Sequence, residues 1–261
     1  MSAGFFLVTE ATYHAAHLRA AWERTFADRP GYGGIAVRAD RSSAVDNSTP
    51  ASGWLDHGPT DDAMERLFGP LDGDFREDHV WLGPQINGPR AASWLSTVAA
   101  DEKPLIFVFL DRMLAPWWMK SASAVLNSHS AVLPHARGTF AIENVGAERD
   151  IERFRASLGA TVHYVDEGVD TGPIIQASRV ADPFASASIW ECKARSFQLA
   201  FDLLIDVADR FISHPAVPVG TAPAPSPWHG PDFRRRDFTE ERRKAAEEGF
   251  LAMRNEVYPW K

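Results

Sequence analysis

Three polar side chains in the middle of the chain could take part together in proton transfer and in stabilising a developing negative charge. Asn127 and His129 stand two positions apart at the end of an apolar run, so in an extended segment they project from the same face. Asp170 lies in an acidic, glycine-containing turn after a second strand-like run, residues 161–165. An amide N–H can hold an oxyanion, and an imidazole can move a proton near neutral pH when a carboxylate orients it. Taken singly, each is as readily a turn or structural residue, so the spacing shows only that the three can meet at one sheet edge.

The residues around these positions resemble the folate-dependent formyltransferase family, which includes glycinamide ribonucleotide transformylase and methionyl-tRNA formyltransferase. The first family motif is matched at Asn127, His129, Leu133, Pro134, Arg137 and Gly138, and the second at nearly all of residues 161–175. Ser130 replaces the usual proline, and Ala131 and Val132 replace Ser-Leu, which changes the loop beside the Asn/His pair. The resemblance covers about residues 85–180, is weak toward the N-terminus and does not extend to the last 80 residues.

The resemblance implies an N-formyltransferase that uses 10-formyltetrahydrofolate as cosubstrate and a small amine, of specialised or sugar metabolism, as acceptor. In those terms Asn127 donates to the oxyanion and His129 polarises the formyl oxygen or relays a proton. Asp170 orients His129 and accepts the proton of the amine, directly or through a water. The residues implied for the folate pocket are Arg112, Met113, Leu114, Val165, Asp166, Glu167 and Gly168.

Three alternatives stay open at this point. The same trio could hydrolyse the formyl-folate with water in place of the amine, although such deformylases usually carry an N-terminal regulatory domain and this sequence starts on the first strand. A transferase of a related group, such as carbamoyl, is the second alternative. The third is a non-catalytic ligand-binding module, which the altered loop at Ser130 motivates.

The pattern of apolar residues predicts the fold that would carry these groups. Strands are expected at residues 5–8, 34–38, 80–82, 105–110, 161–165 and 176–180, and helices at residues 13–26, 61–68, 87–99, 150–158, 188–213 and 239–254. The fully apolar run 105–110 is typical of a central parallel strand. We expect an α/β, Rossmann-like, doubly wound and mostly parallel sheet over residues 1–181, followed by a helical C-terminal extension over 182–261 with a proline-rich crossing at 214–231.

Several positions qualify this picture. The polar turn expected at residues 9–12 has no glycine and carries Glu10, so it is a poor phosphate cradle and argues against a phosphorylated acceptor at that place. Residues 39–60 are expected to form a long loop. Lys193 is the one break in the apolar stripe of helix 188–213. His163 is interpreted as a structural strand residue and His135 as a residue at the pocket rim.

Composition narrows the partners. The formal net charge of −8 disfavours nucleic acid, and the basic run 234–236 between Asp232 and Asp237 is interpreted as a solvated patch. The tail shows no additional β-barrel of the kind that helps bind tRNA. One cysteine, Cys192, indicates a reducing compartment, and the absence of a signal sequence or long apolar run predicts a cytoplasmic protein without a membrane span. No metal-ligand spacing is found, and the amphipathic tail helix could serve a homodimer.

Overall fold

The computed structural model describes residues 4–40, 62–70, 79–214, 218–228 and 232–259, so the expected loop at 39–60 lies almost entirely outside the described residues. The strands are β1 (Phe5–Glu10), β2 (Tyr32–Arg38), β3 (Val80–Trp81), β4 (Leu105–Phe109), β5 (Ala124–His129), β6 (Gly159–Tyr164) and β7 (Ile174–Arg179). The α-helices are α1 (Tyr13–Phe26), α2 (Ala63–Phe68), α3 (Pro89–Val98), α4 (Pro116–Ser121), α5 (Ala141–Glu148), α6 (Ile151–Ser157), α7 (Ile189–Ser213) and α8 (Glu240–Val257).

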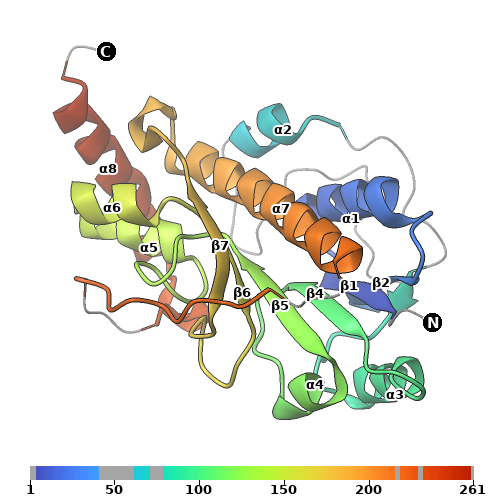
Figure 1. The fold of residues 1–261 in the computed structure, drawn as a ribbon. Helices are drawn as coiled ribbons and strands as arrows, with labels where there is room; N and C mark the ends of the chain where they lie inside the picture. Colours follow the sequence, from blue (N-terminus) through green and yellow to red (C-terminus); the bar gives the residue numbers. More distant parts are fainter. Residues whose placement is uncertain (1–3, 41–61, 71–78, 215–217, 229–231, 260–261) are drawn as a thin grey trace.

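The strands form one sheet in the order β3-β2-β1-β4-β5-β6-β7, which confirms the α/β, Rossmann-like and mostly parallel fold (Figure 1). Strands β3, β2, β1, β4 and β5 pair in parallel, whereas β6 pairs antiparallel with both β5 and β7. The chain winds outward from β1 through β2 to β3, then returns to β4 and winds the other way. The carboxyl ends of β1 and β4 are therefore the switch point where doubly wound sheets bind ligands.

Helices cover both faces of the sheet. On one face, α1, α2 and α7 pack on a core that includes Trp22, Phe107 and Phe201. On the other, α3 and α4 pack on a core that includes Leu95 and Trp118. Trp118 is fully buried, which agrees with an ordinary core residue of a short helix. The alternation of side chains along each buried strand supplies both cores, as the unbroken apolar runs predict.

The longest helix, α7, lies along the sheet rather than apart from it. Its first turn is capped by Ser188, whose hydroxyl accepts a hydrogen bond from the Glu191 N–H at 3.1 Å, as the capping spacing predicts. Its apolar stripe packs on β5, β6 and β7, and Cys192 is buried within it. The domain boundary placed at residue 181 stays a prediction, although α7 shares its core with the preceding strands.

A third cluster of buried residues joins α5, α6 and α8 beside β7. Helix α5 was not expected from the sequence. It begins after Phe140, whose φ is 56°, and it packs against α8 so closely that a Cβ on Gly249 would lie 2.2 Å from the carbonyl oxygen of Gly146. Helix α8 is capped by Thr239, and ion pairs link Arg243 to Glu247 and Lys244 to Glu248, as their spacing predicts.

The chain before α8 returns across the carboxyl edge of the sheet. Thr221 bridges Ile174 of β7, and the Thr139 N–H donates a 2.9 Å hydrogen bond to the carbonyl of Phe233. The described part of the proline-rich crossing, residues 218–228, contains no helix, as an extended crossing requires. The C-terminal segment thus forms part of the wall around the carboxyl ends of β1, β4 and β5.

Candidate active site

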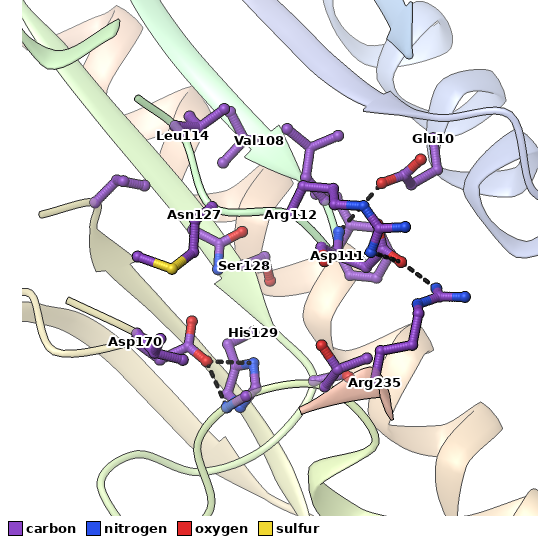
Figure 2. A pocket seen from close by; sticks show the side chains of 18 of the residues that line it. Glu10, Val108, Asp111, Arg112, Leu114, Asn127, Ser128, His129, Asp170 and Arg235 are labelled. Carbon is purple, nitrogen blue, oxygen red and sulfur yellow. Dashed lines mark hydrogen bonds and ion pairs between the residues drawn. The ribbon is translucent and has the colours of Figure 1, made fainter. Parts of the chain in front are cut away.

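A cavity of about 440 Å³ opens at the carboxyl ends of β1, β4 and β5, where the sheet topology favours a ligand (Figure 2). Asn127, His129 and Asp170 line one part of it, and Glu10, Asp111 and Arg235 line another. Phe109, Phe140 and Phe197 supply apolar walls. The three side chains selected from the sequence therefore do converge on one cavity.

Asn127 reaches the cavity from the end of β5, in register opposite His163 of β6. The Nδ1 of His163 donates to the carbonyl oxygen of Tyr164 at 2.8 Å, and its Nε2 lies 3.2 Å from Nδ2 of the Asn127 amide. The Oδ1 of Asn127 is buried and has no hydrogen-bond partner among the described residues, so it can accept from a ligand. The amide nitrogen carries two N–H groups and has one neighbour, His163, so an N–H can also donate to a ligand.

His129 is fixed by two contacts, one on each ring nitrogen. Its Nε2 donates to the carbonyl of Ala136 at 3.0 Å, and its Nδ1 lies 3.5 Å from Oδ2 of Asp170. Burial is the largest influence on the pKa of His129 and lowers it, with smaller contributions from His163 and Lys193, while Asp170 and the Ala136 carbonyl act in the opposite direction. The imidazole is therefore neutral at rest, and its Nδ1 lone pair faces the carboxylate of Asp170. This carboxylate would stabilise a proton bound at Nδ1.

Asp170 lies on the connection between β6 and β7 with φ at 50°, a conformation that aspartate tolerates better than most residues. Burial raises the pKa of Asp170, but His129, His163 and the N–H of Gly138 outweigh it and hold the pKa well below its ordinary value. The Gly138 N–H donates to Oδ2 at 2.8 Å, and Nε2 of His163 lies 3.5 Å from Oδ1. The carboxylate is therefore charged and held in place by groups from β6 and from the segment after β5.

The residues expected to hold a folate fall mostly on the same cavity. Arg112, Met113, Leu114, Val165, Asp166 and Gly168 line it. Glu167 does not line it and is exposed to solvent. Asp166 shapes the turn, since its Oδ1 accepts from the N–H of Gly168 at 3.0 Å and from the hydroxyl of Thr171 at 2.7 Å. The cavity thus gathers six of the seven residues, and their roles remain proposals.

The other end of the cavity is a cluster of charges from four distant segments. Glu10 ends β1, and its carboxyl accepts from the Arg38 Nε at 2.7 Å and from the Asp111 N–H at 3.2 Å. Arg235, from the C-terminal segment, pairs with the carboxylate of Asp111. Burial and the neighbouring Asp111 raise the pKa of Glu10 to about 8. At neutral pH this end therefore carries more positive than negative charge, with Glu10 protonated.

Two interpretations of the sequence need correction here. Thr9 and Glu10 belong to strand β1 rather than to a turn. Arg235 is not part of a solvated patch, because it lines the cavity and pairs with Asp111, whereas Arg236 is exposed. His163 is a buried residue of β6, as interpreted, and it also lines the cavity and contacts both Asn127 and Asp170.

Other sequence expectations are placed as follows. His135 does not line the cavity; it packs edge-on against Trp228. Within the part of the chain that the structure describes, no group of three or more His, Cys, Asp or Glu side chains is arranged to hold a metal ion. None of the helices in the same described residues has the length and apolar character needed to span a membrane.

Comparison with known proteins agrees with this geometry. Residues 97–192, which contain β4, β5, β6 and the polar trio, match the family model described as formyl transferase. This part of the chain, residues 97–192, belongs to the formyltransferase family. A methionyl-tRNA formyltransferase of Albidiferax ferrireducens is 30% identical over 177 residues, 67% of this chain and 47% of that protein. A phosphoribosylglycinamide formyltransferase of Bacillus subtilis is 48% identical over 54 residues, 20% of this chain and 24% of that protein.

The chain thus spans less than half the length of these curated relatives. Among solved structures, a sugar N-formyltransferase from a Shewanella species has a TM-score of 0.60 at 13% identity, covering 96% of this chain and 89% of that one. An N-formyltransferase from Helicobacter canadensis, in complex with folinic acid and dTDP-3-aminofucose, has a TM-score of 0.57 at 13% identity, covering 94% of this chain and 80% of that one. At these identities the likeness establishes the shared fold.

Proposed function

We propose that this protein transfers a formyl group from 10-formyltetrahydrofolate to the amine of a small acceptor. The observation that carries the proposal is the His129–Asp170 pair, with Nδ1 and Oδ2 3.5 Å apart, facing the same cavity as Asn127. Family membership supports formyl transfer as the reaction class. The complex of the Helicobacter canadensis protein with folinic acid supports a folate as the formyl carrier.

Formyl transfer to an amine passes through a tetrahedral intermediate with a negatively charged oxygen. In the proposed reaction the amine attacks the formyl carbon, and the amide of Asn127 stabilises the oxyanion, a contribution worth about 3–4 kcal/mol for donors of this kind. The attacking nitrogen becomes positive and must lose a proton. The neutral His129 accepts that proton at Nδ1, where Asp170 stabilises the resulting imidazolium, directly or through a water. Collapse of the intermediate breaks the bond to the folate nitrogen, which takes the proton from the His129 imidazolium and so restores the neutral ring.

Each end of the cavity binds one of the two substrates. In this proposal the wall made by Met113, Leu114, Val165 and the 166–170 turn holds the folate, because it combines apolar surface with backbone and carboxylate groups. The acceptor then lies toward Glu10, Asp111 and Arg235. An amino sugar is the first acceptor class to test, since the neighbours of this fold include proteins described as sugar N-formyltransferases.

The direct test incubates the purified chain with 10-formyltetrahydrofolate and a panel of amines that covers nucleotide-linked amino sugars, amino acids and diamines. Tetrahydrofolate formation and a formylated product detected by mass spectrometry are the expected results. Formate release that does not depend on any amine would assign the hydrolase activity instead. Absence of folate binding by calorimetry would reject both activities and leave the fold as a binding module for another ligand.

A further inference from the structure

A buried lysine that the proposed chemistry does not use lies in the wall of the cavity. Lys193 on α7 occupies a position between Trp190 and Phe197 in an otherwise apolar stripe, and it is only 4% exposed. Its Nζ lies 3.2 Å from Oε2 of Glu143 on α5 and 3.4 Å from the hydroxyl of Ser130. Lys193 and Ser130 both line the cavity, and Ser130 directly follows His129 at the end of β5.

Stability alone does not account for this pair. Glu143 is fully buried, and taking two charges out of water generally offsets most of what their attraction contributes. A leucine or methionine at residue 193 would continue the stripe without that desolvation. Replacing a buried ion pair with apolar side chains of similar volume is often neutral or stabilising. The two charges in this wall of the cavity therefore indicate a role in the site.

Lys193 is one of several groups that surround His129 and the end of β5. The imidazole faces Asp170 from the β6–β7 connection, His163 from β6, and Lys193 from α7, whose charge is balanced by Glu143 on α5. Ser130 is bound from the side by the lysine, while the residue after it, Ala131, is held by a 2.9 Å hydrogen bond from the Thr161 hydroxyl to its carbonyl. The end of β5 is thus fixed from two elements.

We propose that Lys193 is a positioning residue for the transfer reaction: its ammonium group, oriented by Glu143, fixes Ser130 and places a positive charge near His129. This inference rests on the proposed formyl transfer. The charge favours the neutral imidazole that must accept the proton of the amine, and the bond to Ser130 holds the strand end from which that imidazole projects. Lys193 acts through these neighbours and does not touch the reacting atoms.

The decisive variant removes the whole pair, Lys193→Met with Glu143→Met, so that no buried charge is left alone. We expect it to fold with a melting temperature equal to or above that of the parent. Its kcat should fall about tenfold, with the KM for the folate changed less than about threefold, because an interaction that matters in the transition state is lost. The acid limb of the kcat/KM profile should move upward, because Lys193 is the member of the pair whose charge lowers the pKa of His129.

Two further variants separate the roles of the lysine. Ser130→Ala removes the hydroxyl without changing charge, so kcat should fall a few-fold with an unshifted acid limb, and Ser130→Thr should restore it. Arg195→Met is the matched control, because Arg195 sits on the same helix, pairs with Glu191 and does not line the cavity. It should leave both kcat and the pH profile unchanged.

The titration of His129, followed by NMR in labelled protein, gives a readout that needs no turnover. A higher midpoint in the double variant than in the parent supports the inference even if the acceptor has not been found. An active parent whose double variant keeps the same kcat, acid limb and His129 midpoint overturns it. A parent that binds the folate but transfers no formyl group rejects the proposed function and leaves the NMR comparison to decide the electrostatic part.

Discussion

The Nδ1 atom of His129 lies 3.5 Å from Oδ2 of Asp170, while the same carboxylate oxygen accepts a 2.8 Å hydrogen bond from the N–H of Gly138. Asp170, from the β6–β7 connection, is thereby tied both to His129, the proposed proton acceptor, and to the backbone of the segment that follows β5. Several consequences of this arrangement can be measured.

Replacing Asp170 with Asn should reduce kcat about 10²- to 10⁴-fold, the range typical of a lost acid–base partner. The neutral amide of asparagine lacks the negative charge that would stabilise an imidazolium at His129. Steady-state kinetics with saturating folate measure the loss. Asp202→Asn, an exposed position on α7, is the control and should behave like the parent. Full activity of Asp170→Asn would remove the carboxylate from the mechanism.

The pH profile should have its acid limb below the ordinary histidine value, because burial lowers the pKa of His129 and the neutral ring is the active form. Asp170 raises that pKa, so in Asp170→Asn the residual activity should show an acid limb at still lower pH. Rates measured from pH 4.5 to 8.5 show whether the acid limb of the variant moves to lower or to higher pH. An upward shift in the variant would mean that the charged imidazole is the active form.

Replacing Asn127 with Ala should lower kcat about 10²- to 10³-fold and leave folate affinity within a few-fold, as expected for a donor that acts on the oxyanion. Calorimetric binding of the folate together with single-turnover rates would separate the two quantities. Equal losses in affinity and rate would instead indicate that the amide serves to bind the ground state.

Gly138→Ala should both destabilise the fold and weaken the hydrogen bond from the Gly138 N–H that holds Asp170. Gly138 has φ at 90°, and an added Cβ would lie 2.0 Å from the carbonyl oxygen of Phe233. Gly69 is a matched control, because its φ is 71° and an added Cβ would meet nothing within 4 Å. Gly69→Ala should cost about 1–2 kcal/mol for backbone strain alone. Gly138→Ala should cost at least about 2 kcal/mol more in urea unfolding, and equal costs would contradict the clash.

Glu10 predicts a pH dependence of stability. Its pKa rises from 4.5 to about 8 on folding, so the folded state binds the proton more tightly than the unfolded state. The contribution of the protonated Glu10 to the free energy of unfolding is fully present below about pH 4.5 and is lost as the pH rises toward 8 and beyond. Between pH 6 and pH 9 the parent should lose roughly 2 kcal/mol more than Glu10→Gln, measured by urea unfolding at each pH. Parallel curves for the two proteins would show that Glu10 is ionised throughout.

The elements of the sheet could be predicted because their information is local. Strand β4 is an unbroken apolar run, α1 has the expected helical period, and α7 begins at Ser188 with its capping partner three residues on. The side-by-side projection of Asn127 and His129 also follows from period-two alternation, with Ser128 turned the other way to donate to the Ala200 carbonyl at 2.7 Å.

The rest depends on contacts between distant segments. Helix α5 has no side-chain cap, contains Gly146 and is stabilised by α8, so nothing in its own sequence marks it. His163 could have been found only by pairing β6 antiparallel to β5, which sets it opposite Asn127. Glu10 and Arg235 meet through Asp111, and no local pattern connects them. Lys193 did carry a signal, as the single charge in an apolar stripe, and its partners became visible only in the folded chain.

The wall contributed by Arg235 has a consequence for how the cavity forms during folding. The cavity is bounded by the first strand at one side and by the segment after the proline-rich crossing at the other, joined through Asp111. Two segments that lie far apart in the sequence must therefore both be in place before the cavity has its full wall, so a folding intermediate that holds only the sheet would present an open groove.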